Sequence, residues 1–316
     1  MDTAVVSWRP GVRKARAALI LLALLLLSGH GLAAMRVVTT TTDLKSLTEA
    51  IGGDRLSVAA LVPPGTDAEE YAVRPGDLRR VRDAQLVVRV GVDYDLWLDP
   101  LLLQVGNPAL ARGGAAHVDA SYAIALLEVR GAAIGDAGGH AHGSGNPHYW
   151  LDPANAEIIT GNILEALLRL DPGNARFYEQ RRLDYLALLR TKIELWTRQL
   201  APYAGKAIVA YHNDWAYFAR RFRLNIADFV ETRPGVPPSP AHLATLLALT
   251  RENNIRVFVR EPQQPAPQIE FLAARASAQV ALLAANVGSL PGTEDYVALF
   301  EVNIASLRKA FAAATT

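Results

Sequence analysis

The stretch ARFYEQRRLDYLALLRTKIELWTRQL, residues 175–200, is the longest candidate helix in this chain of 316 residues. Its apolar side chains recur at helical spacing, as at Phe177, Leu186, Leu189, Ile193 and Trp196. A helix of this length is roughly 39 Å long, enough to span two domains. A long surface helix is the ordinary alternative. Because strand and helix patterns lie on both sides of it, we predict a helix that connects two lobes.

Both flanks of this helix alternate between β-branched runs and amphipathic segments. Before it, strands are expected near 35–41, 56–62 and 86–90; after it, near 206–211, 225–230, 255–259 and 280–284. Such alternation favours parallel sheets. We therefore predict an α/β fold with two lobes, each a mainly parallel sheet flanked by helices, joined by one long rigid helix. The expected divisions are 34–172, 173–202 and 203–316. Asp43 is expected to cap the first helix.

The first 33 residues resemble a secretion signal. A basic start containing Arg9, Arg13 and Lys14 precedes an apolar run at 17–27, and small residues follow at 31–33. The chain contains no cysteine, which excludes disulfides, thiolate metal ligands and an N-terminal lipidated cysteine. We therefore expect a signal peptide over residues 1–33 and an unanchored periplasmic product.

Composition excludes some classes of function. Hydrophobic residues make up 51% and charged residues 20%, which suits a globular chain with a large core. The formal net charge is only +1, and the first 33 residues contribute more basic than acidic side chains. We therefore expect no nucleic-acid partner, and we expect a monomer.

A histidine lies on a rigid lead-in to a helix, in Asn146-Pro-His-Tyr-Trp-Leu-Asp-Pro153. Asp152 is a favourable N-cap and Pro153 suits the first helical position. The glycine-rich loop 138–145 just upstream carries His140 and His142. A histidine-bearing loop that leads into a fixed His148 suggests metal binding. A core histidine after a flexible loop is the alternative.

Other polar residues follow predicted strands. His212 and Glu261 each come directly after a strand, and Glu69 and Glu70 lie in the loop after another. Since ligands bind at the carboxyl ends of parallel strands, these groups can meet in a cleft between the lobes. Imidazole and carboxylate ligands suit zinc, manganese or iron(II). The alternatives are a buried, hydrogen-bonded His212 and a solvated loop for the two glutamates.

Four stretches together resemble the zinc/manganese solute-binding proteins of periplasmic ABC transporters, over about residues 35–312. They are Leu61–Tyr71 with Arg74-Pro-Gly-Asp77, the histidine loop with Pro-His-Tyr-Trp-Leu-Asp-Pro, Val209–Phe218, and Pro237-Pro-Ser-Pro240 with Val257–Pro262. The resemblance implies two α/β lobes, a divalent metal bound between them, and delivery of that metal to a membrane permease.

The same resemblance implies a set of ligands. By position, His148 is the second ligand and His212 the third. The chain departs from the family twice, with Glu69 at the first histidine position and Asn286 where an aspartate is common. The implied metal ligands are thus Glu69, His148, His212 and Asn286, with Glu261 or water as alternatives for the fourth.

The leading hypothesis is a non-enzymatic zinc-binding component of an ABC importer. Manganese or iron(II) on the same scaffold is the second, and a metal-dependent hydrolase with an open zinc position is a third from another class. A metal chaperone or sensor without a permease is a fourth. A diverged member with a weakened site is also considered, because two of the four ligand positions differ from the family.

Overall fold

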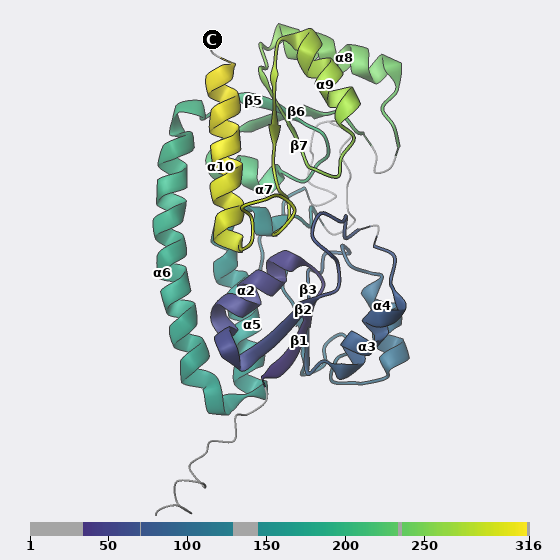
Figure 1. The fold of residues 1–316 in the computed structure, drawn as a ribbon, viewed down its shortest axis with the longest axis vertical. Coiled ribbons are helices and arrows are strands. Elements are labelled where there is room, and N and C mark those ends of the chain that lie inside the picture. Colours follow the sequence, from purple (N-terminus) through teal and green to yellow (C-terminus); the bar gives the residue numbers. More distant parts are fainter. Residues whose placement is uncertain (1–33, 70, 129–144, 233–235, 315–316) are drawn as a thin grey trace, which may run out of the picture. The chain divides into compact units, whose positions relative to one another are not determined.

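The computed structural model describes residues 34–69, 71–128, 145–232 and 236–314. From Met35 onward the chain forms one compact unit, which contains two four-stranded sheets (Figure 1). Among the helices in the described part of the chain, none combines the length and the apolar character that a membrane crossing requires.

The first sheet has the strand order β2-β1-β3-β4, and every pair in it is parallel. Its strands are β1 (Met35–Thr39), β2 (Leu56–Ala60), β3 (Leu86–Arg89) and β4 (His117–Asp119). The helices around it are α2 (Thr42–Gly52), α3 (Pro75–Asp83), α4 (Leu98–Val105) and α5 (Ala156–Leu170). Apolar side chains of α3 and α4 pack on one face of the sheet, and those of α2 and α5 on the other.

The second sheet repeats this arrangement with the order β6-β5-β7-β8, again all parallel. Its strands are β5 (Ala207–Ala210), β6 (Asn225–Phe229), β7 (Val257–Arg260) and β8 (Gln279–Leu282). The helices around it are α7 (Ala216–Phe222), α8 (Pro240–Glu252), α9 (Ala266–Ala276) and α10 (Tyr296–Ala313). Here α8 and α9 pack on one face, while α7 and α10 pack on the other. The predicted pair of parallel α/β lobes is thus confirmed.

The long helix α6 (Ala175–Leu200) begins and ends at the predicted residues. It runs beside α2 and α5 of the first lobe and α10 of the second (Figure 1). Trp196 is buried and stacks on Phe300 of α10, with ring centroids 5.2 Å apart. Truncating such a buried tryptophan costs about 3–5 kcal/mol of stability. The helix is therefore part of a core that continues through both lobes, and this makes it a stiff connection.

The segment 146–152 also joins the two lobes. It contains a 3₁₀ turn at Tyr149–Leu151, and Asp152 caps the next turn by accepting a hydrogen bond from the Ala154 amide. Arg221 of α7 binds both carboxylate oxygens of Asp152, at 2.6 and 2.9 Å. The Trp150 indole donates to the carbonyl of Ala285 at 2.9 Å. These bonds fix the backbone just after His148.

Two local expectations need correction. The helix expected from Pro153 starts with a 3₁₀ turn, and its α-helical part begins at Ala156. The cap of α2 is Thr41, whose hydroxyl accepts from the Leu44 amide, and not Asp43. The Asp43 side chain is fully buried because it binds a loop of the second lobe instead.

Candidate metal centre

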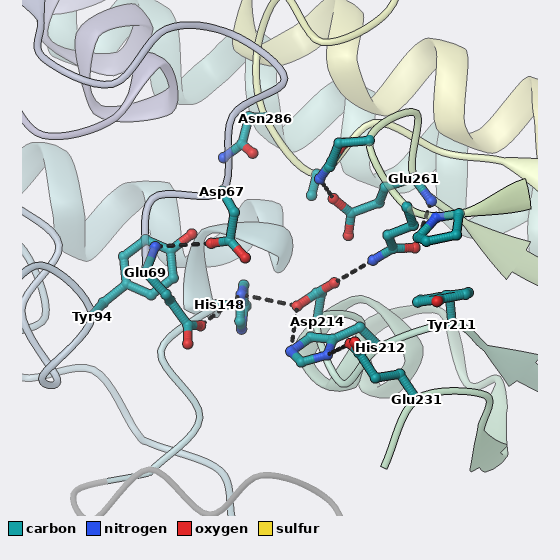
Figure 2. Close-up of a pocket in the computed structure, with 14 residues that line it drawn as sticks. Asp67, Glu69, Tyr94, His148, Tyr211, His212, Asp214, Glu231, Glu261 and Asn286 are labelled. Atoms are coloured by element: carbon teal, nitrogen blue, oxygen red, sulfur yellow. Dashed lines mark hydrogen bonds and ion pairs between the residues drawn. The ribbon is translucent and has the colours of Figure 1, made fainter. Parts of the chain in front are cut away.

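A cavity of about 300 Å³ lies where strands of both sheets end (Figure 2). Its lining comes from the loops after β2 and β3, from the segment before α5, and from the loops after all four strands of the second sheet. The lining residues are Asp67, Glu69, Tyr94, His148, Tyr211, His212, Asp214, Glu231, Glu261, Gln263, Gln264, Pro265, Ala285 and Asn286.

All four residues predicted as ligands line this one cavity, namely Glu69, His148, His212 and Asn286. Glu261, the alternative for the fourth position, lines it as well. Glu70, His140 and His142 lie outside the described residues. The structure therefore brings the predicted groups together, and their role as ligands stays a prediction.

His148 is held so that one ring nitrogen faces the cavity. Its side chain is buried, and its Nδ1 lies 3.2 Å from Asn146 Oδ1, which also accepts the His148 amide at 3.0 Å. The rings of Tyr94 and Trp150 pack against the imidazole, with centroids 5.4 and 5.2 Å away. Because Nδ1 faces an acceptor, Nε2 is the nitrogen left to bind an ion.

His212 has the same arrangement with a different partner. It follows β5, and its Nδ1 lies 2.9 Å from Glu231 Oε2, a residue that follows β6. Burial alone would lower the pKa of His212, but the carboxylates of Asp214, Glu231 and Glu69 together raise it. The Nε2 atom of this ring also faces the interior of the cavity (Figure 2).

Asp214 stands between the two imidazoles, and the sequence did not single it out. Its Oδ1 lies 3.1 Å from His148 Nε2 and 3.7 Å from His212 Nε2. Its Oδ2 accepts a hydrogen bond from Gln264 Nε2 at 3.3 Å. Burial raises the pKa of Asp214, but the two histidines together with hydrogen bonds to Glu261 and Gln264 lower it overall. The sequence pattern around Asp214 indicates only the start of a helix. The one signal for a role at the site was its position two residues after His212.

Glu69 approaches from the loop after β2. Its Oε1 lies 3.6 Å from His148 Nε2, and the side chain is 19% exposed. Two bonds fix the loop backbone: Asp67 Oδ1 accepts the Glu69 amide at 2.8 Å, and the Trp97 indole donates to the Ala68 carbonyl at 2.7 Å. Glu69 is therefore a positioned carboxylate and not a solvated loop residue.

Asn286 and Glu261 lie at the edge of this group. Asn286 Nδ2 donates to Asp43 Oδ2 at 2.9 Å, and in Figure 2 the side chain lies apart from Glu69, His148 and Asp214. Glu261 is buried, and burial followed by the charge of Asp214 raises its pKa well above the ordinary value. Its Oε2 accepts a hydrogen bond from Gln263.

The centre of the cavity thus holds two imidazole Nε2 atoms facing two carboxylate oxygens. Such groups lie stably together only with a shared proton or a cation between them. Within the part of the chain that the structure describes, no three histidine, aspartate or glutamate groups already surround a common point. Binding an ion here therefore requires small movements of the side chains. The chemistry of the lining suits a divalent transition metal.

Comparison with known proteins identifies relatives. The family model described as zinc-uptake complex component A, periplasmic, matches residues 37–310. A high-affinity zinc uptake system protein of Yersinia pestis is 29% identical over 78% of this chain and 81% of its own length. A manganese ABC transporter substrate-binding lipoprotein of Streptococcus pneumoniae is 26% identical, over 70% of each chain.

A solved structure agrees with the fold. The crystal structure of a zinc-bound deletion mutant of the zinc-uptake protein ZnuA superposes with a TM-score of 0.75 and is 26% identical. The match covers 88% of this chain and 98% of that one.

Proposed function

This chain belongs to the family of periplasmic zinc-uptake complex component A, and from that membership we propose that it captures zinc and delivers it to a membrane permease. Its relatives are substrate-binding proteins of metal ABC transporters and not enzymes. The chain is accordingly a metal-binding solute-binding protein, and the hydrolase alternative has no support among these relatives.

The observation that carries this proposal is the paired orientation of His148 and His212. Each ring has its Nδ1 beside an acceptor, and each Nε2 is turned toward the carboxylate of Asp214. Acceptors on the far nitrogen are the usual support of metal-binding histidines, because they fix the ring and raise its basicity. Glu69 supplies a carboxylate oxygen beside His148. For the fourth ligand, the predicted candidates are the Asn286 carbonyl oxygen, Glu261 or water.

Zinc is proposed first because two imidazoles with carboxylate oxygens form a common zinc environment. Manganese or iron(II) is the second candidate, supported by the oxygen-rich lining of the cavity, since carboxylates suit manganese better than imidazoles do. The manganese-binding relative is consistent with this alternative.

We further propose that the protein acts in the periplasm and that residues 1–33 are its signal peptide, which lie outside the described residues. Release to the permease would use small shifts of the loops, because α6 packs on helices of both lobes and resists a wide opening. N-terminal sequencing of the exported protein tests the first part: a start near Ala34 is expected, and an intact start in the cytosol would contradict it.

The deciding experiment combines elemental analysis with competitive titrations of zinc and manganese. The parent protein is expected to bind one ion tightly, and His148→Ala and His212→Ala are expected to lose that binding. His242→Ala is the matched control, because the His242 ring contacts the Phe229 carbonyl and is not among the residues that line the cavity. A parent without tight binding, or a control as weak as the other variants, would contradict the proposal.

A further inference from the structure

We propose that Asp214 is the fourth ligand of this site, so that the ion is bound by Glu69, His148, His212 and Asp214. This assignment rests on the proposed metal-binding function, and it replaces Asn286, which the family resemblance implied for the fourth position. It is carried by the distances between the polar atoms in the centre of the cavity and by the way each side chain is anchored.

Three separations between these atoms are close to those of a tetrahedral site. With bonds of about 2.0–2.1 Å, the ligand atoms of a tetrahedral zinc lie roughly 3.3–3.4 Å from one another. Asp214 Oδ1 lies 3.1 Å from His148 Nε2 and 3.7 Å from His212 Nε2. Glu69 Oε1 lies 3.6 Å from His148 Nε2. Shifts of a few tenths of an ångström bring these pairs to the ideal spacing.

Hydrogen bonds to the other polar atoms of these side chains leave the proposed ligand atoms facing the cavity. Asp214 Oδ2 is bound by Gln264, so Oδ1 is the oxygen that faces the imidazoles. The Nδ1 atoms of the two rings are bound by Asn146 and Glu231. Three of the four proposed ligands therefore already have the outer hydrogen bonds that orient metal-binding side chains.

Asn286 is placed for a different task. Its Nδ2 donates to Asp43 Oδ2, and the adjacent Val287 amide donates to Asp43 Oδ1 at 3.0 Å. These two bonds fix the loop after β8 to the start of α2. In Figure 2 the Asn286 side chain lies away from the two imidazoles, whereas Asp214 lies between them.

The assignment also determines the charge of the site. Two carboxylates and two neutral imidazoles carry two negative charges, which a divalent cation neutralises. A buried cation is strongly favoured by such compensation. With Asn286 in place of Asp214, the four ligands themselves would carry only one negative charge, and the second would have to come from a carboxylate that does not bind the ion.

The test compares Asp214→Asn with Asp67→Asn, by competitive zinc titration and by the absorption spectrum of the cobalt(II)-loaded protein. Asp67 also lines the cavity, so its variant removes the same charge and makes the same change of atoms, while the asparagine Oδ1 can still accept the Glu69 amide. Replacing a residue outside the coordination shell typically weakens metal binding 10–100-fold. Asp214→Asn is therefore expected to lose more than about 100-fold and to change the cobalt spectrum, while Asp67→Asn keeps the spectrum of the parent.

Each result has one meaning. A parent that binds neither zinc nor cobalt would refute the proposed function itself. A parent that binds tightly, with Asp214→Asn within about tenfold of it, would refute the role of Asp214 and leave the proposed function standing. Equal losses in both variants, with unchanged cobalt spectra, would show a general effect of charge and also refute ligation. Thermal unfolding of the metal-free variants checks that neither substitution unfolds the protein.

Discussion

Asn286 donates a 2.9 Å hydrogen bond from Nδ2 to Asp43 Oδ2, which joins two side chains 243 positions apart in the chain. Asp43 follows the first strand of the first lobe, and Asn286 follows the last strand of the second. The bond therefore connects the first lobe to the second lobe beside the cavity. Burial raises the pKa of Asp43 to about 6, although the bonds from Asn286 and Val287 act in the opposite direction.

This raised pKa predicts how stability depends on pH. An Asp titrates near 3.9 in the unfolded chain, so between about pH 4 and pH 6 the folded state binds the proton more tightly. Proton binding by Asp43 therefore adds roughly 3 kcal/mol to the free energy of unfolding below pH 4, and this contribution is lost as pH rises through about 6. Denaturant unfolding of metal-free parent and Asp43→Asn is the measurement. The parent should lose stability relative to the variant from pH 4 to pH 7; parallel curves would contradict this.

Glu69→Ala is expected to weaken zinc binding as severely as His148→Ala, by more than about 100-fold, because it removes an oxygen ligand and a negative charge. Glu69→His should shift preference toward zinc over manganese, since imidazole suits zinc better. Competitive titrations of both metals measure this. Glu70→Ala is the neighbouring control, and a Glu69→Ala protein that binds zinc like the parent would show that another carboxylate is the ligand.

Glu231 is expected to act through His212. Glu231→Ala removes the acceptor at Nδ1 and should weaken zinc binding about 10–100-fold. Glu231→Gln keeps an oxygen there and should lose less. Because Glu231 helps to raise the pKa of His212, the Gln variant should also lose zinc to protons at a lower pH than the parent does. Zinc titrations between pH 5 and pH 8 measure both effects, and an unchanged pH midpoint would oppose this role.

Glu128 is expected to position both histidine segments. Its Oε2 accepts from Asn146 Nδ2 at 3.1 Å and from Asn213 Nδ2 at 2.7 Å. Asn146 holds His148, and Asn213 is the neighbour of His212. Glu128→Ala should therefore weaken zinc binding by about tenfold without changing the cobalt spectrum. Glu128→Gln retains an acceptor oxygen and should recover most of the loss. If both variants bind zinc equally weakly, the negative charge of Glu128 and not its acceptor oxygen is responsible.

Local signals predicted much of the fold. The limits of α6 agree with the helix predicted over residues 175–200 from its apolar periodicity. The general rule for parallel sheets also predicted that Glu69, His212 and Glu261 meet in one cavity, and all three line it. This rule depends only on where the strands end, so it needs no knowledge of individual contacts.

The remaining features depend on contacts that a linear pattern does not contain. Asp43 has the spacing of a helix cap, yet Thr41 occupies that role and Asp43 binds a loop 243 residues away. Asp214 is similar to any residue at the start of a helix until its side chain is seen between two imidazoles. Glu231 follows a strand without any motif around it. In each case the partner, and not the local sequence, decides what the side chain does.

The ribosome makes this chain from its N-terminus, and α6 separates the proposed ligands into two groups of two. Glu69 and His148 precede the helix, while His212 and Asp214 follow it. A nascent chain that has emerged only as far as α6 therefore has half a binding site, with one carboxylate and one imidazole. It cannot retain an ion tightly until the second sheet has folded against the same helix. If these four residues bind the ion, metal loading waits for the finished protein, and the ion that is bound would then reflect the compartment where folding is completed and not the one where synthesis began.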